Sequence, residues 1–189
     1  MWPLLGCSLV SLTITIERLF FWWRQKYAFS ATRIERILER VDAKDYEAAA
    51  SVKGMGRDSV SAMLAAGLKH REHGLSEAMQ VEAGVRIDAM KQGLSVLDTI
   101  VTMAPLLGIL GTVLGIIASF ELLGASGIED PKAVTGGIAQ ALITTAAGLA
   151  VAIVSLIPLN YFVARTQRET RRLEQTATQF EVACRRNGG

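Results

Sequence analysis

The sequence has few of the residues that build metal centres and disulfides. Among its 189 residues are two histidines and two cysteines. His70 and His73 lack a third placed ligand, so we expect them on a solvated helix face rather than at a metal site. Cys7 lies in an apolar run and Cys184 in a charged C-terminal segment. We therefore expect two free thiols and no disulfide.

Catalytic motifs are also missing. The chain has no phosphate-binding Walker pattern, and Gly54 and Gly56 alone are more typical of a plain loop. It has no Ser-His-Asp arrangement, no placed pair of carboxylates and no segment that alternates like a strand. The sequence therefore argues against an enzyme, requires no cofactor, and indicates an all-α fold.

Charge is missing from two long runs. Residues 100–120, IVTMAPLLGILGTVLGIIASF, are long enough to cross a membrane, because a helix needs about 20 apolar residues to do so. Residues 133–164 would form roughly 48 Å of helix at about 1.5 Å per residue, more than the hydrocarbon core of about 30 Å. We expect this second helix to tilt or project past the bilayer, with a bend or an exit near Pro158 and Asn160.

A third, weaker span begins the chain. Residues 1–16 carry no charged side chain, and Glu17, Arg18 and the run LFFWW follow. This run is short for a crossing, but Arg18 can extend to the interface, and Trp22 and Trp23 suit an interfacial belt. No basic segment precedes the run and no small-residue cleavage site follows it. A retained signal anchor over residues 2–22 is therefore favoured over a cleaved signal peptide.

Small residues recur at spacings of three and four on both long apolar runs. In lipid, burial of apolar surface does not drive helices together, so such faces allow close backbone contact instead. We expect these faces to pack each helix closely against other helices. They comprise Gly108, Gly111, Thr112, Gly115 and Ser119 on one run, and Gly137, Ala141, Thr144, Thr145, Gly148, Ala152 and Ser155 on the other.

Gln140 is the strongly polar side chain deep in the second run. It and the threonines could hydrogen-bond between helices, an interaction that contributes about 0.6 kcal/mol on average and up to about 1.7 kcal/mol. Alternatively, they could line a hydrated ion path. Composition leaves both open and favours the first. Gln140 and Thr145 are separated by about 140° around a helix and cannot share a narrow stripe, whereas Gln140 and Thr144 can.

The charge distribution predicts the topology. Of the 20 Lys and Arg residues, twelve fall between 24 and 95 and six between 165 and 186, whereas residues 121–132 have one Lys and three acids. Since basic segments stay in the cytoplasm, we expect an external N-terminus and a cytoplasmic tail. The expected segments are span one at 2–22, a cytoplasmic insertion at 24–98, span two at 99–123, a short external loop at 124–132, span three at 133–163 and the tail at 164–189.

The insertion reads as short helices. One apolar face is expected over residues 34–41, a turn at 42–46, and a loop at 54–59 in which Asp58 or Ser59 caps the next helix. From Ser76 the three-four spacing continues to Asp98, so we expect a helix that runs unbroken into span two. So few residues in short helices make a thin core, which we expect to rest on long extensions of the membrane helices. The mixed charges give no indication of nucleic-acid binding.

Residues 104–120, APLLGILGTVLGIIASF, and residues 136–153, GGIAQALITTAAGLAVAI, resemble the two signature membrane helices of the MotA/TolQ/ExbB family. Three spans with a large cytoplasmic insertion resemble its ExbB/TolQ branch, whereas the MotA branch has four. The specific match covers roughly residues 85–165. By this resemblance, the family's polar threonines correspond to Thr112 and Thr145, and the proline that opens the span-two motif is Pro105.

The resemblance implies a multi-pass protein of the bacterial inner membrane that forms a homo-oligomeric ring, proposed in this family to be a pentamer. The ring would surround a single-span partner like ExbD or TolR that carries a membrane aspartate. Together they would couple the ion gradient, most simply protons, to work on the cell envelope, such as TonB-dependent import or Tol-type maintenance, through a TonB- or TolA-like protein. The N-terminus would be periplasmic and the C-terminus cytoplasmic.

One departure from the family pattern bears on mechanism. ExbB and TolQ proteins usually place a glutamate where this chain has Gln140, and a glutamine cannot hold a proton. The missing membrane carboxylate keeps an alternative open, a non-conducting scaffold ring that only holds a single-span partner. A small-solute transporter is disfavoured, because the sequence shows no inverted repeat or broken helices.

Overall fold

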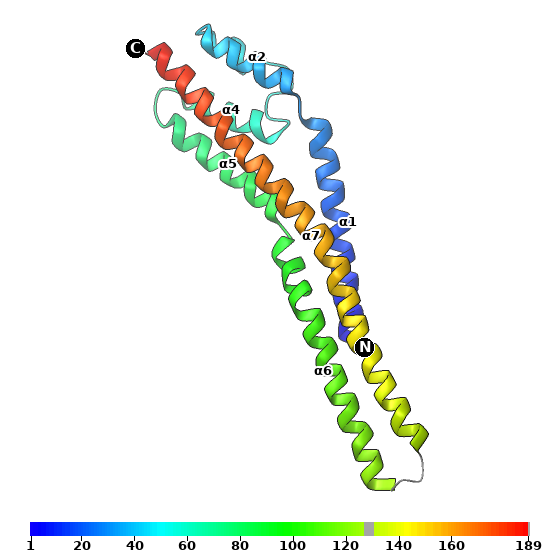
Figure 1. Ribbon diagram of the computed structural model, residues 1–189. Helices are drawn as coiled ribbons and strands as arrows, with labels where there is room; N and C mark the ends of the chain where they lie inside the picture. The colour runs from blue at the N-terminus through cyan, green and yellow to red at the C-terminus, as the bar shows by residue number, and fades with distance from the viewer. Residues whose placement is uncertain (127–130, 189) are drawn as a thin grey trace. The chain divides into compact units, whose positions relative to one another are not determined.

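A computed structural model describes residues 1–126 and 131–188, and within them every regular element is a helix (Figure 1). The all-α prediction is therefore confirmed for the described residues. Residues 127–130 of the predicted short loop at 124–132 lie outside them, and the remaining residues of that range belong to the two flanking helices. The helices are α1 (Trp2–Ala28), α2 (Ala31–Asp42), α3 (Tyr46–Ala50), α4 (Ser59–Lys69), α5 (Leu75–Lys91), α6 (Leu94–Ser126) and α7 (Pro131–Gly188).

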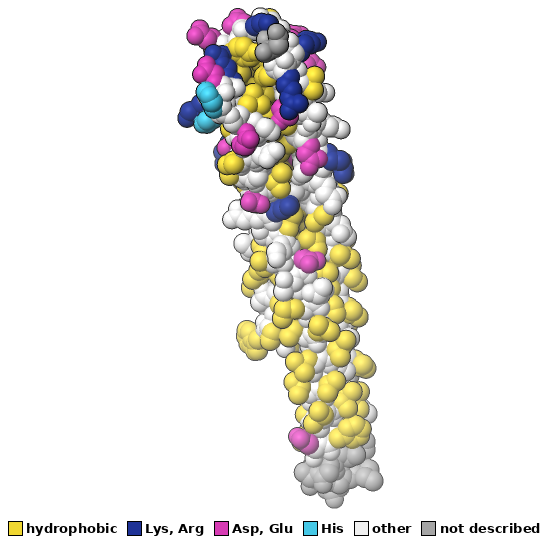
Figure 2. Space-filling model, turned by 90° about the vertical axis from the view of Figure 1, so that its left-hand side faces the viewer, with side chains coloured by type: hydrophobic (Ala, Val, Ile, Leu, Met, Phe, Trp, Pro, Cys, Tyr) yellow, Lys and Arg dark blue, Asp and Glu magenta, His cyan; other side chains and the backbone are white. Residues whose placement is uncertain are grey.

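The chain divides into two compact units. The membrane unit comprises Met1–Arg18 and Gly93–Phe162, and the insertion unit comprises Leu19–Gln92 and Val163–Gly189. On the face shown in Figure 2, Lys and Arg side chains gather on the insertion unit, while hydrophobic side chains cover much of the membrane unit. The helices α1 and α7 contribute residues to both units.

Among the described residues, three stretches of helix are long and apolar enough to cross a membrane, as the sequence predicted. The most apolar windows have mean hydropathies of 1.6 in Trp2–Tyr27, 2.3 in Leu75–Leu122 and 2.2 in Val134–Arg186. Large apolar side chains on these helices point away from the rest of the chain. In water such surfaces would be costly, so lipid or other protein must cover them. Examples are Leu106, Leu114, Ile153, Val154 and Ile157.

The predicted unbroken helix from Ser76 into span two is wrong. The helix α5 ends at Lys91, Gln92 is extended with ψ 132°, and α6 begins at Leu94. Between them Gly93 has φ 76°, a left-handed conformation that glycine adopts at little cost. The three-four spacing of apolar residues continues across the break, so periodicity alone did not reveal it.

Within the membrane unit, α1 contacts the other two long helices. Leu4 of α1, Ala104 of α6 and Ala152 of α7 form one buried cluster. The hydroxyls of Ser11 and Ser155 lie 2.6 Å apart and join α1 to α7 through a buried hydrogen bond. The weakest of the three predicted spans is thus packed into the unit rather than separate from it.

One expectation for a charged residue is corrected. Arg18 does not extend outward: it is buried, and its guanidinium donates to both carboxylate oxygens of Glu17, with Nε 2.9 Å from Oε2. This two-point contact compensates the charge locally. The helix α7 continues through Pro158 to Gly188, and the expected bend or exit from lipid near Pro158 and Asn160 stays a prediction.

The insertion unit has a core to which α7 contributes. Ile37 and Val41 of α2 and Met63 and Leu64 of α4 are fully buried in it. The extension of α7 adds the buried residues Leu173, Phe180 and Ala183. The prediction that the short helices rest on an extended membrane helix is therefore confirmed.

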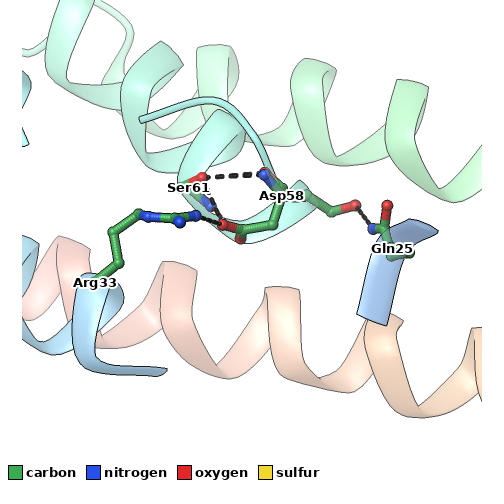
Figure 3. A network of polar contacts seen from close by, with 5 residues as sticks. Gln25, Arg33, Asp58 and Ser61 are labelled. Carbon is green, nitrogen blue, oxygen red and sulfur yellow. Dashed lines mark hydrogen bonds and ion pairs between the residues drawn. The ribbon is translucent and has the colours of Figure 1, made fainter. Parts of the chain in front are cut away.

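A polar network organises the start of α4 (Figure 3). Asp58 is the N-cap and forms a capping box with Ser61, as the sequence had suggested for position 58 or 59. Arg33 donates to Asp58 Oδ2 at 2.7 Å, and Gln25 of α1 donates to the Ser59 hydroxyl. These bonds connect α1, α2 and α4 within the insertion unit.

The two histidines do not lie within a helix, contrary to the prediction. His70 follows the last residue of α4, and His73 lies in the turn before α5. Both are exposed. Within the described residues, no group of three or more His, Cys, Asp or Glu side chains could hold a metal ion. Cys7 and Cys184 are free thiols.

Candidate ion pathway

The site is built on the close contact between α6 and α7. A Cβ atom added at Gly115 would lie 2.7 Å from Ala141 Cβ, and one at Gly148 would lie 2.5 Å from the Ala104 carbonyl oxygen. Facing positions rise along α6 as they fall along α7, so the two helices pack antiparallel. The facing pairs are Ser119 with Gly137, Gly115 with Ala141, Gly111 with Thr144, Gly108 with Thr145, and Ala104 with Gly148.

The small faces therefore pack two helices of the same chain. Five of the glycines that the sequence singled out, at 108, 111, 115, 137 and 148, lie at this contact. Pro105 lies inside α6 and does not end it. Such close backbone approach is the usual role of small residues in membrane helices. Contacts of these faces with a second copy of the chain remain a prediction.

At the centre of the contact, Thr112 of α6 and Thr145 of α7 bring their hydroxyls together. The two oxygens are within hydrogen-bonding distance of each other. Thr112 Oγ1 also lies 3.1 Å from the carbonyl oxygens of Gly108 and Ala141, and Thr145 Oγ1 lies 3.1 Å from that of Gly108. Both side chains are half-buried.

Counting protons shows what this pair can still bind. Each hydroxyl has one proton to donate and two lone pairs to accept. The neighbouring groups that bond to Thr112 and Thr145 are carbonyl oxygens and the other hydroxyl, so the two protons are used while lone pairs on the hydroxyl oxygens stay free. The pair is thus suited to accept a hydrogen bond from water or from a protonated carboxyl group.

The other two expected pathway residues lie differently. Thr144 is only 9% exposed, and its hydroxyl donates within α7, 2.8 Å from the Ala141 carbonyl oxygen. Gln140 is exposed, and its side chain makes no hydrogen bond within the described part of the chain. The structure thus brings Thr112, Thr144 and Thr145 together, while Gln140 and Thr144 do not share one exposed stripe.

The site has no titratable group of its own. Residues 100–120 of α6 and 133–164 of α7 include no Asp, Glu, His, Lys or Arg. Hydroxyl and carboxamide groups can relay hydrogen bonds but do not hold a proton near neutral pH. Proton transport at this site would therefore need a titratable group from another molecule.

One polar contribution was missed from the sequence. Ser8, Ser11 and Thr15 recur along α1 at three- and four-residue spacing, and with Ser155 they line a cavity of about 320 Å³ in the membrane unit. The same spacing rule that found the faces of α6 and α7 would have found this one. It was overlooked because larger apolar residues separate these positions and only the α7 partner shows that they line a cavity, in which Ser11 is buried and Ser8 is exposed.

Several known proteins are similar to this chain in sequence. A profile of the MotA/TolQ/ExbB proton channel family matches residues 56–175. An ExbB-like 3 biopolymer transport protein of Synechocystis is 32% identical over 191 residues, covering 97% of this chain and 90% of that protein. The ExbB biopolymer transport protein of Aquifex aeolicus is 42% identical over 40% of this chain and 51% of its own length. The Tol-Pal system protein TolQ of Pseudomonas aeruginosa is 34% identical over 60% of this chain and 49% of its own length.

Proposed function

Because this chain belongs to the MotA/TolQ/ExbB proton channel family, we propose that it is an ion-conducting subunit of an ExbB/TolQ-type motor in the bacterial inner membrane. The family consists of channel and scaffold proteins, not enzymes. The observation that carries the proposal is the Thr112–Thr145 hydroxyl pair, which retains acceptor capacity inside a closely packed pair of apolar helices.

The missing titratable group defines the partner. The hydroxyl pair would accept a hydrogen bond from the protonated carboxyl of a membrane aspartate on a single-span protein of the ExbD/TolR kind. A charged carboxylate is costly in the apolar interior of a membrane. The acid would therefore be neutral beside Thr112 and Thr145 and would release its proton where water reaches it. Exposed Gln140 would offer hydrogen bonds along a hydrated surface without titrating.

Assembly and orientation complete the proposal. Several copies, most simply five, would form a ring around the partner helices, with the exposed apolar side chains of α6 and α7 against lipid or neighbouring copies. The concentration of Lys and Arg in residues 24–95 and 165–186 supports a cytoplasmic insertion unit and tail. The N-terminus would then be periplasmic, and the ion gradient would drive work on the envelope through a TonB- or TolA-like protein.

A second candidate is a scaffold ring that holds a partner helix without conducting ions. The same hydrogen bonds also support this candidate. Both threonine protons already have acceptors within the chain, so the hydroxyl pair could serve only to join α6 and α7. The absence of a carboxylate from the apolar parts of these helices also fits a scaffold.

Proton flux distinguishes the two. The chain and its co-purified single-span partner are reconstituted in vesicles, and flux is measured with a pH-sensitive dye under an imposed gradient. Thr145→Val keeps the side-chain shape and removes the hydroxyl, so we expect flux to be lost while the complex stays intact. The matched control is Thr102→Val on α6, whose exposed hydroxyl bonds only to its own helix, 2.9 Å from the Thr99 carbonyl oxygen.

The outcomes separate cleanly. Loss of flux in Thr145→Val with normal flux in Thr102→Val supports the channel. Full flux in both variants refutes the pathway through the hydroxyl pair. A partner complex that forms normally but shows no flux even as wild type supports the scaffold.

A further inference from the structure

The insertion unit contains a basic cavity whose lining residues take no part in the proposed ion pathway. Its volume is about 70 Å³, and Lys26 of α1 and Arg165 and Arg172 of α7 contribute to its lining. Since a single water needs about 10–15 Å³ by this measure, the space suits a group of several such atoms. The adjoining surface of α7 carries Arg168 and Arg171, which extend the positive charge.

Aromatic rings stack on both guanidinium groups, and Arg172 also forms an ion pair with Glu169. The Arg165 Cζ atom lies 5.2 Å from the centroid of the Trp22 ring, and the Arg172 Cζ atom lies 4.0 Å from that of Phe29. Stacking of this kind orients the planar group and leaves its N–H donors at the edge available. Arg165 Nε is buried and has no hydrogen-bond partner within the described residues. A buried charged donor without an acceptor is unfavourable, so the charge of Arg165 is not compensated locally within the described residues.

The two acids that also line the cavity do not fill this role. Asp58 is already engaged, because its carboxylate accepts from Arg33 at 2.7 Å and from the Ser61 hydroxyl at 2.8 Å. Glu169 lies 3.5 Å from Arg172 Nη1, at the limit of a hydrogen bond. Neither carboxylate bonds to Arg165 or Lys26, so these two cations remain available to an external anion.

The position of the cavity along the chain indicates which anion. Arg165 directly follows the uncharged run of α7 that ends at Ala164, and Lys26 lies four residues after Trp22 at the end of the apolar part of α1. Basic pockets beside membrane helices are typical binding sites for the headgroups of anionic lipids. Planar guanidinium groups match the oxygens of a phosphate group in particular.

We propose that this cavity binds the phosphate group of an anionic phospholipid at the membrane surface, with Arg165, Arg172 and Lys26 as its ligands. The Arg165 guanidinium donates to a phosphate oxygen, and Lys26 adds a positive charge at the exposed side. Soluble phosphate shares this chemistry, but it would not account for a cavity placed where both helices leave their apolar runs.

The test uses the full chain, purified with its partner in a nonionic detergent and stripped of lipid. Binding of phosphatidylglycerol, phosphatidylcholine and inorganic phosphate is titrated by native mass spectrometry. We expect the wild type to prefer phosphatidylglycerol to phosphatidylcholine, and Arg165→Gln to weaken phosphatidylglycerol binding by about tenfold or more. Arg165→Lys keeps the charge but lacks the planar guanidinium, so its affinity for phosphatidylglycerol should lie between those of the wild type and Arg165→Gln.

Two further variants keep the test decisive. Lys26→Gln changes an exposed side chain and should weaken binding even if Arg165→Gln fails to fold. Arg36→Gln removes an equal charge from an exposed site on α2 and should leave binding unchanged. Equal losses in Lys26→Gln and Arg36→Gln, or no loss in Arg165→Gln and Lys26→Gln, overturn the site. Inorganic phosphate that displaces the lipid at equal concentration overturns the lipid as its natural occupant.

Discussion

Gly148→Ala should push α6 and α7 slightly apart. The substitution places a methyl group against backbone atoms of α6, which cannot change rotamer as a side chain could. The added Cβ would lie 2.5 Å from the Ala104 carbonyl oxygen and 3.0 Å from Gly108 Cα. Ordinary contacts begin at 3.4 Å, so the helices must move apart by about 0.9 Å at this point. That movement also lengthens the bond from Thr145 Oγ1 to the Gly108 carbonyl oxygen, now 3.1 Å.

The expected cost follows from a matched pair of variants. Alanine is favoured over glycine in a helix by about 1 kcal/mol, and this gain applies equally to Gly136→Ala, where nothing lies within 4 Å of the added Cβ. Overpacking a tight contact costs about 1–3 kcal/mol. Gly148→Ala should therefore have a free energy of unfolding about 1–3 kcal/mol lower than Gly136→Ala.

The measurement is reversible unfolding by sodium dodecyl sulfate in mixed micelles, followed by circular dichroism at one protein concentration. Equal free energies of unfolding for the two variants would refute the close contact at Gly148. A lower value for Gly136→Ala than for Gly148→Ala would show that α7 presents a different face to α6.

Three other outcomes are expected. Gln140→Glu should preserve proton flux in reconstituted vesicles, because the family usually has that acid. Gln140→Leu should reduce flux without preventing assembly. Equal flux in both variants would remove Gln140 from the pathway. Arg33→Gln should lower the free energy of unfolding by about 1–3 kcal/mol, since its carboxylate partner is only 2% exposed. Arg186→Gln breaks an exposed ion pair and should change the free energy of unfolding by about 0–1 kcal/mol. Chemical denaturation of both variants compares the two values. In a chain freed of its native cysteines, a cysteine at Gly127 should react with a membrane-impermeant maleimide from outside and one at Gly56 only after lysis, and labelling of position 127 only from the cytoplasm would overturn the three-span orientation.

Much of the fold could be predicted from residue patterns. The three apolar stretches were recognisable because a membrane helix must satisfy its own backbone and present apolar side chains over its whole length. The cap at Asp58 and the buried face at Ile37 and Val41 are local features of one or two helical turns. The break at Gly93 was not predicted, because glycine is compatible with both a continued helix and a left-handed turn.

The candidate site was predicted only in part. Family resemblance pointed to Thr112 and Thr145, and small-residue spacing pointed to the glycines around them, but spacing along one helix does not say which helix it meets. The structure pairs these faces within one chain and separates exposed Gln140 from buried Thr144. Arg18, expected to reach outward, is instead held by Glu17.

The sequence alone was sufficient for helix type, for the number of membrane stretches and for the absence of a titratable group in two of them, because these depend on composition and on periodicity within a single element. Only the tertiary structure decided that the hydroxyls of Thr112 and Thr145 meet, and that Arg165 stacks on Trp22 with a donor left free. Those contacts join residues 33 and 143 positions apart in the chain. Such pairs are set by the register and rotation of packed helices, which no local pattern specifies.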